Sequence, residues 1–173
     1  EERRGRGLGG RTVEPSHEVL DRLPPELGDP VVARLRVAAR PQRVDGLLGL
    51  CPERRDLVHS DLLHQNVLLS EDWSRVTAVF SWKCSVRGDF LFDVAWCTFW
   101  SAWHPGIAAI DLWERTARDP ELDGLLVAAP ERHHCYELVI GANHLGWHAW
   151  TGDGDELRRV AKHTAAILER GPR

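Results

Sequence analysis

The sequence lacks methionine, long apolar runs and closely spaced cysteines. Its cysteines are Cys51, Cys84, Cys97 and Cys135, and no two of them form a Cys-x-x-Cys pair. This spacing argues against a zinc knuckle and against a disulfide framework, so a reduced, cytosolic setting is the simplest interpretation. No apolar stretch approaches the roughly 20 residues of a membrane span, and no signal peptide opens the chain. Because methionine is absent altogether, we do not expect residue 1 to be a natural start.

An excess of charge of one sign is also absent. The net charge is -4 and the isoelectric point is near 6.1, which favours neither nucleic acid nor an anionic membrane as a partner. A local exception is the run over residues 1–15, which is basic and rich in glycine, and we expect a solvated tail or linker there. Residues 16–173 are enough for one compact domain with a hydrophobic core.

The middle of the chain predicts a small β-hairpin. Residues 75–80 alternate and are rich in β-branched side chains, which favours a strand. The apolar run 66–69 is separated from them by the polar, turn-type segment 70–74, so we expect strand, turn and strand. A further short apolar run covers residues 57–59. Two strands alone are marginally stable, so the hairpin must pack on helices.

The rest of the sequence predicts helices, which makes the expected fold class α+β and mostly helical. Helices are expected over residues 16–23, 90–103, 107–118, 131–150 and 155–170, and residues 31–50 are expected to be rich in helix with an interruption at Pro41. The segment 90–103 is apolar nearly all round, which indicates a helix buried on most sides. Trp96, Trp100 and Trp103 recur at helical spacing, and core packing explains them better than a platform for stacking a ligand.

The strongest chemical signal is the pattern His59-x-Asp61-x-x-x-x-Asn66. Phosphoryl transfer needs a carboxylate that orients the acceptor hydroxyl and takes its proton, together with ligands that hold Mg²⁺ on the nucleotide phosphates. Asp61 suits the first role, and Asn66 at the far end of the loop offers a neutral oxygen for the second. The spacing of Asp61 and Asn66 is that of the protein-kinase catalytic loop.

Three segments carry a wider resemblance. They are residues 57–68 with the catalytic loop, residues 76–82 (Val-Thr-Ala-Val-Phe-Ser-Trp) and residues 88–95 (Gly-Asp-Phe-Leu-Phe-Asp-Val-Ala). Together they resemble the aminoglycoside phosphotransferase family, which shares the protein-kinase-like fold; residues 99–100 and 135–138 match hygromycin-type kinases more weakly. The resemblance implies an ATP-dependent, Mg²⁺-requiring enzyme of antibiotic resistance. Such an enzyme moves a phosphoryl group to a hydroxyl of a small molecule, either aminoglycoside-like or a metabolite.

The resemblance also implies roles for individual residues. Asp61 would be the catalytic base and Asn66 a metal ligand. His59 would brace the loop through hydrogen bonds, and Asp93 on the following helix would accept backbone N–H groups of the loop. Asp89 would cap that helix, because an acidic residue at a helix N-terminus is favourable.

The chain departs from the family at Ser81. In the family an Asp follows this strand and chelates Mg²⁺, whereas here a serine stands at the metal position. A hydroxyl is a weaker ligand for a hard dication than a carboxylate, so we expect impaired activity. Lys83 adds a positive charge nearby, and a surface lysine is its simplest interpretation.

A second departure concerns the family's N-terminal lobe, a β-sheet with a phosphate-pairing lysine. Nothing before His59 supplies such strands, and the first lysine is Lys83. We therefore expect residues 16–173 to be a kinase-like C-terminal lobe whose nucleotide lobe is missing. Two functions remain open at this point: an impaired phosphotransferase, or a non-catalytic remnant that binds a ligand or partner without transfer.

Other patterns near the motif carry less weight. His59 and His64 suggest a metal hydrolase, but their spacing is not that of a typical zinc site. In the family, later helices shape the acceptor pocket, so Glu137, Trp147 and Trp150 are candidates for contacts with the substrate. Further acidic residues that would suit a polycationic acceptor are Asp111, Glu114, Asp153, Asp155 and Glu156, each of which is individually better explained as a surface charge.

Overall fold

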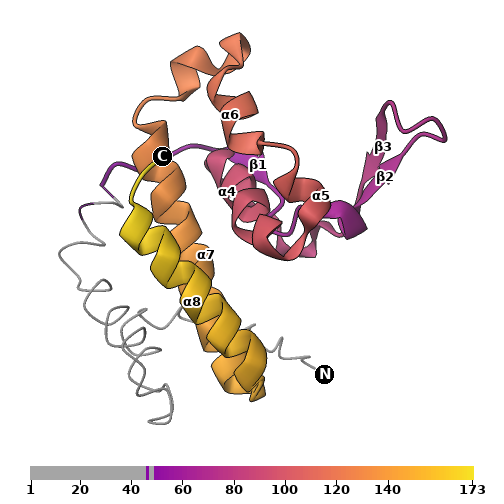
Figure 1. The fold of residues 1–173 in the computed structure, drawn as a ribbon. Coiled ribbons are helices and arrows are strands. Elements are labelled where there is room, and N and C mark those ends of the chain that lie inside the picture. Colours follow the sequence, from indigo (N-terminus) through magenta and orange to yellow (C-terminus); the bar gives the residue numbers. More distant parts are fainter. Residues whose placement is uncertain (1–45, 47–48) are drawn as a thin grey trace, which may run out of the picture.

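The computed structural model describes residues 46 and 49–173 (Figure 1). The expected tail over 1–15, the expected helix over 16–23 and most of the expected helix over 31–50 lie outside the described residues. Within the described part, short strands come first and helices follow, so the expected α+β class with a mostly helical body is confirmed. None of the described helices combines the length and the apolar character that a bilayer span requires.

The described strands form two separate antiparallel pairs. β2 (Val67–Leu69) pairs with β3 (Val76–Val79), and this hairpin projects away from the helices in Figure 1. β1 (Asp56–Val58) pairs with β4 (Val86–Gly88). The sequence predicts the hairpin and misses β4, because three residues that end in glycine carry no recognisable alternation.

Three long helices make up the body: α4 (Leu91–Trp100), α7 (Ala129–Thr151) and α8 (Gly154–Arg170). Shorter helical turns connect α4 to α7, namely η4 (Ser101–Trp103), α5 (Pro105–Ala108), α6 (Leu112–Ala117) and η5 (Pro120–Leu125). The single helix expected over 107–118 is wrong. Asp111 interrupts it, because its carboxylate accepts a hydrogen bond from the Glu114 amide at 3.0 Å and caps the start of α6.

The hydrophobic core lies where α7 packs against both α4 and α8, which lie beside it in Figure 1. Phe99 of α4, Ile140 of α7 and Val160 of α8 are almost fully buried there. Trp96, Trp100 and Trp103 pack against this core and against one another, so their interpretation as packing residues is confirmed. The packed helix pair α7–α8 supports α4, which in turn carries the site described below.

The close approach of α7 and α8 depends on one glycine. A Cβ placed on Gly141 would lie 2.3 Å from the Thr164 hydroxyl oxygen and 3.0 Å from the Thr164 Cβ. Thr164 cannot turn away easily, because it is 2% exposed and its hydroxyl donates to the Val160 carbonyl at 2.8 Å. Any side chain at position 141 therefore pushes the two helices apart.

We predict that Gly141→Ala lowers the free energy of unfolding by about 1–3 kcal/mol, because overpacking outweighs the better helix propensity of alanine. Gly106→Ala in α5 is the matched control, since a Cβ there meets nothing within 4 Å. It should be neutral or slightly stabilising. Urea unfolding followed by circular dichroism measures both, and equal stabilities for the two variants would contradict this account of the α7–α8 contact.

Candidate active site

The carboxylate of Asp93, in the first turn of α4, binds the backbone of the loop between β1 and β2. The backbone N–H of His59 donates to Asp93 Oδ2 at 2.8 Å, and the N–H of Ser60 donates to Oδ1 at 2.8 Å. Ser60 has φ of 62°, a left-handed conformation that turns two consecutive N–H groups toward one acceptor. The contact expected of Asp93 is therefore present.

His59 is the buried centre of the loop and is 1% exposed. Its Nδ1 accepts the backbone N–H of Asp61 at 3.2 Å, so the ring proton sits on Nε2, which donates to the Phe80 carbonyl at 2.7 Å. The ring also lies 4.7 Å from that of Trp82, measured between centroids. Both ring nitrogens are thus used in bracing the loop, which leaves none to bind a metal and speaks against the hydrolase alternative.

Asp61 and Asn66 face each other across the loop. The Asn66 amide nitrogen donates to the Asp61 backbone carbonyl at 2.7 Å and to Asp61 Oδ2 at 3.1 Å. Asn66 closes η2 (His64–Asn66) and is buried, whereas Asp61 is half-exposed. The Asn66 nitrogen donates to Asp61, so the amide oxygen of Asn66 and Asp61 Oδ1 are the side-chain oxygens of this pair that take no part in its hydrogen bonds.

Ser81 follows the end of β3 and is tied to the same loop. The N–H of the preceding Phe80 donates to the Asn66 carbonyl at 3.1 Å, and the Phe80 carbonyl accepts from His59. Ser81 itself has φ of 67° and ψ of 41° and precedes η3 (Trp82–Cys84), in which Lys83 is exposed. The structure thus brings Asp61, Asn66 and Ser81 to one end of the β2–β3 hairpin.

The oxygen donors at this end suit Mg²⁺ only in part. An amide oxygen at Asn66 and a hydroxyl at Ser81 are hard ligands, but Mg²⁺ sites usually include one or two carboxylates. No group of three or more His, Cys, Asp or Glu side chains that could hold a metal occurs among the described residues. Neither Asn66 nor Ser81 supplies a carboxylate.

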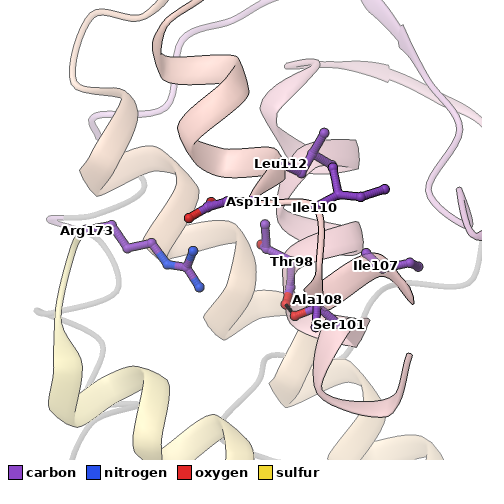
Figure 2. Close-up of a pocket in the computed structure, with 8 residues that line it drawn as sticks. All are labelled: Thr98, Ser101, Ile107, Ala108, Ile110, Asp111, Leu112 and Arg173. Carbon is purple, nitrogen blue, oxygen red and sulfur yellow. Dashed lines mark hydrogen bonds between the residues drawn. The ribbon is translucent and has the colours of Figure 1, made fainter. Parts of the chain in front are cut away.

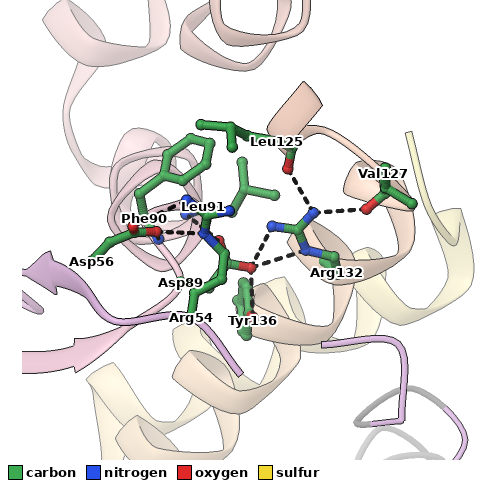
Figure 3. A network of polar contacts seen from close by, with 9 residues as sticks. All are labelled: Arg54, Asp56, Asp89, Phe90, Leu91, Leu125, Val127, Arg132 and Tyr136. Atoms are coloured by element: carbon green, nitrogen blue, oxygen red, sulfur yellow. Dashed lines mark hydrogen bonds and ion pairs between the residues drawn. The ribbon is translucent and has the colours of Figure 1, made fainter. Parts of the chain in front are cut away.

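Asp89 plays a larger part than the expected helix cap. Its Oδ1 does accept the N–H of Leu91, the first residue of α4, at 3.2 Å. Its Oδ2 accepts Arg132 Nη2 at 2.6 Å, Arg132 Nε at 2.9 Å and the Tyr136 hydroxyl at 2.8 Å, as Figure 3 shows. Asp89 and Arg132 are both buried, so the start of α4 is joined to α7 by an ion pair sheltered from water.

A second carboxylate supports the same junction. Asp56 of β1 accepts the N–H of Phe90 at 3.2 Å and pairs with Arg54 at 2.6 Å (Figure 3). The hydrogen bond from Arg54, and then the one from Phe90, lowers the pKa of Asp56. The sequence gives no sign of this network, because Asp56 lies 34 residues from Phe90, and Asp89 lies 43 and 47 residues from Arg132 and Tyr136.

The proposed substrate residues do not gather in one place. Trp147 and Trp150 are exposed at the end of α7, with ring centroids 5.3 Å apart. Glu137 lies nearer the start of α7, is 1% exposed, and is committed to Arg170 at 2.5 Å and to the Thr98 hydroxyl at 3.0 Å. The acidic residues Asp111, Glu114, Asp153, Asp155 and Glu156 act as helix caps or pair with nearby arginines.

Two of the hollows along the described part of the chain are lined by neither Asp61 nor Asn66. A groove of about 710 Å³ runs between the hairpin and the helices, with mostly apolar walls that include Leu63, Leu68 and Ile110. Figure 2 shows a smaller pocket of about 130 Å³, into which the side chain of Arg173 reaches beside Asp111. The small pocket is lined by charges of both signs and the groove by mostly apolar side chains, and neither lining is specific for one class of ligand.

Comparison with known proteins places this geometry in a family. Residues 6–138 match the model of the phosphotransferase enzyme family, which is more than half of the chain. The chain belongs to this family. Hygromycin-B 4-O-kinase of Escherichia coli is 34% identical over 123 residues, which cover 70% of this chain and 33% of that protein.

Solved structures of the family agree in fold. The apo form of a thermostable mutant of aminoglycoside phosphotransferase APH(4)-Ia has a TM-score of 0.64 at 26% identity, over 90% of this chain and 52% of that one. A ternary complex of such a mutant with AMP-PNP and hygromycin B has a TM-score of 0.59 at 26% identity, over 91% and 45%. This chain thus spans about half the length of the solved relatives and a third of the curated one.

Proposed function

We propose that this chain contributes the catalytic loop of a small-molecule kinase, which transfers the terminal phosphoryl group of ATP to a hydroxyl. The observation that carries the proposal is the Asp61–Asn66 hydrogen bond in a loop braced by buried His59. Membership of the phosphotransferase family supports it. A solved relative binds AMP-PNP and hygromycin B together, which supports an aminoglycoside-like acceptor.

In this proposal Asp61 is the base. Its outer carboxylate oxygen accepts the proton of the acceptor hydroxyl as that hydroxyl attacks the phosphoryl group. The hydrogen bond from Asn66 holds the carboxylate in one orientation, which keeps the acceptor in line with the phosphoryl group. His59 and Asp93 are positioning residues, because they shape the backbone on which Asp61 sits.

Mg²⁺ would be held by the side-chain oxygens of Asn66 and Ser81 together with the nucleotide phosphates. When bound, it neutralises charge that develops on the transferring phosphoryl group. We further propose that residues 16–173 form the C-terminal lobe of a kinase-like fold with residues 1–15 as a tail, and that the protein works in the cytosol.

A second function is favoured by Ser81. With a hydroxyl at the metal position, the lobe could retain its shape and bind a ligand or partner without transferring phosphate. The two functions predict different results when a carboxylate is introduced at position 81.

Our first prediction here concerns the base. Asp61→Ala should lower kcat for phosphorylation of hygromycin B by about 10²–10⁴-fold, the usual contribution of a general base. Asp155→Ala is the matched control, because Asp155 is exposed on α8 and its ion pair within the described part of the chain is with neighbouring Arg158. Phosphorylated product is measured by mass spectrometry with Mg²⁺ and ATP. Activity that survives Asp61→Ala unchanged would contradict the assignment.

The second prediction concerns the metal position. Ser81→Asp should raise kcat on the order of a hundredfold and lower the Mg²⁺ concentration needed for half-maximal rate. The backbone accepts the change, because the left-handed conformation of Ser81 is one that aspartate adopts more readily than most residues. Ser81→Asn gives a neutral control of similar size. If Ser81→Asp changes neither rate nor Mg²⁺ dependence, the non-catalytic function is the better description.

A further inference from the structure

Two histidines from separate elements meet beside the catalytic loop. His64 opens η2, shortly after Asp61, and His104 immediately precedes α5. Their ring centroids lie 4.9 Å apart, and the rings meet edge to face at 66°. Neither ring takes part in the contacts that brace the loop, so the proposed function does not account for this pair.

Both rings have nitrogens available to a ligand. His64 is exposed and His104 is half-buried. Within the described part of the chain neither ring forms a hydrogen bond, whereas His59 uses both of its ring nitrogens. A neutral imidazole nitrogen that is not engaged in a hydrogen bond is the form in which histidine binds metal ions.

We propose that His64 and His104 together bind one divalent transition metal ion that prefers imidazole, such as Zn²⁺. With a metal–nitrogen distance of about 2.0–2.1 Å and tetrahedral geometry, two imidazoles on one ion have ring centres about 5 Å apart. The 4.9 Å between these two rings is already close to that separation. Rotation of the rings can then direct one nitrogen of each to a common point, because neither side chain is enclosed.

The backbone on both sides of the pair is held in place. The His104 N–H donates to the Ser101 carbonyl at 3.1 Å, and the His104 carbonyl accepts the N–H of Ile107 at 2.9 Å. In η2 the His64 carbonyl accepts the N–H of Val67, which begins β2. Because the fold already brings the two side chains together, metal binding requires little further ordering of the chain.

The site is open on the side of the apolar groove. Two protein ligands leave the other tetrahedral positions to water or to a bound molecule. His64 and Ile107 line the groove of about 710 Å³, so the open positions adjoin it. The ion is distinct from Mg²⁺, which prefers oxygen ligands, and it adds a link between the catalytic loop and the helical turns after α4.

A second histidine pair provides a comparison. His144 and His148 are about one turn apart on α7, a spacing at which two histidines can share a metal. Their ring centroids are 6.1 Å apart, which is wider than one tetrahedral ion requires. The His144 ring packs edge-on against Trp100, with centroids 4.6 Å apart, and His148 Nδ1 is enclosed without a hydrogen-bond partner. Turning these rings toward one ion would break aromatic packing, so the pair at His64 and His104 is the better site.

Isothermal titration calorimetry of the full chain with Zn²⁺, in an excess of Mg²⁺, tests the proposal. We expect Zn²⁺ to bind, and His64→Gln and His104→Gln should each raise the Kd at least about tenfold, because each removes a direct ligand. His148→Gln is the matched control, since it removes an imidazole from the competing pair, and it should leave the Kd unchanged. Cys84→Ser, which removes the exposed thiol of η3, should also bind like wild type.

A second measurement needs no variant. Zn²⁺ should protect His64 and His104 of the wild-type protein from modification by diethyl pyrocarbonate, which peptide mass spectrometry detects. The proposal is overturned if Zn²⁺ does not bind, if protection falls on other histidines, or if His148→Gln or Cys84→Ser weakens binding as much as His64→Gln does. Neither measurement depends on phosphoryl transfer, so a chain without kinase activity gives the same test.

Discussion

The carboxylate of Asp93 is the constraint on which the rest of the site depends. The loop after β1 bends through a left-handed residue at Ser60, and this bend turns two N–H groups inward. A single carboxylate with two oxygens satisfies both, and α4 delivers it from its first turn. Once these two bonds are made, His59 is directed into the protein and Asp61 outward, so the chemistry of the loop follows from its backbone.

The helices that pack on α4, namely α7 and α8, support the position of the Asp93 side chain. The core of α4, α7 and α8 fixes the axis of α4, and the buried pair of Asp89 and Arg132 fixes its start. Removing one partner of a buried pair leaves an uncompensated charge, so this junction is sensitive to change. Ser81 is a different case, because its left-handed backbone is one that aspartate also adopts readily, and the proposed loss at this position concerns only the side-chain atom offered to the metal.

The sequence was informative where the signal is local. The hairpin β2–β3, the buried helix α4 and the loop from His59 to Asn66 all follow from short patterns, and the contact of Asp93 follows from a family resemblance. Much of what it missed depends on partners far along the chain. Arg132, for example, has the pattern of a polar helix residue, and only the fold places Asp89 beside it. The break between α5 and α6 was missed because a cap at Asp111 outweighs helix periodicity.

The central claim, that Asp93 holds the catalytic loop in shape, is tested most directly by amide hydrogen exchange of His59 and Ser60. In Asp93→Ala both amides lose their acceptor, so they should exchange at least about tenfold faster, while amides of α7 keep their protection. Equal protection of His59 and Ser60 in the variant and the wild type would contradict the account, since another group would then hold the loop.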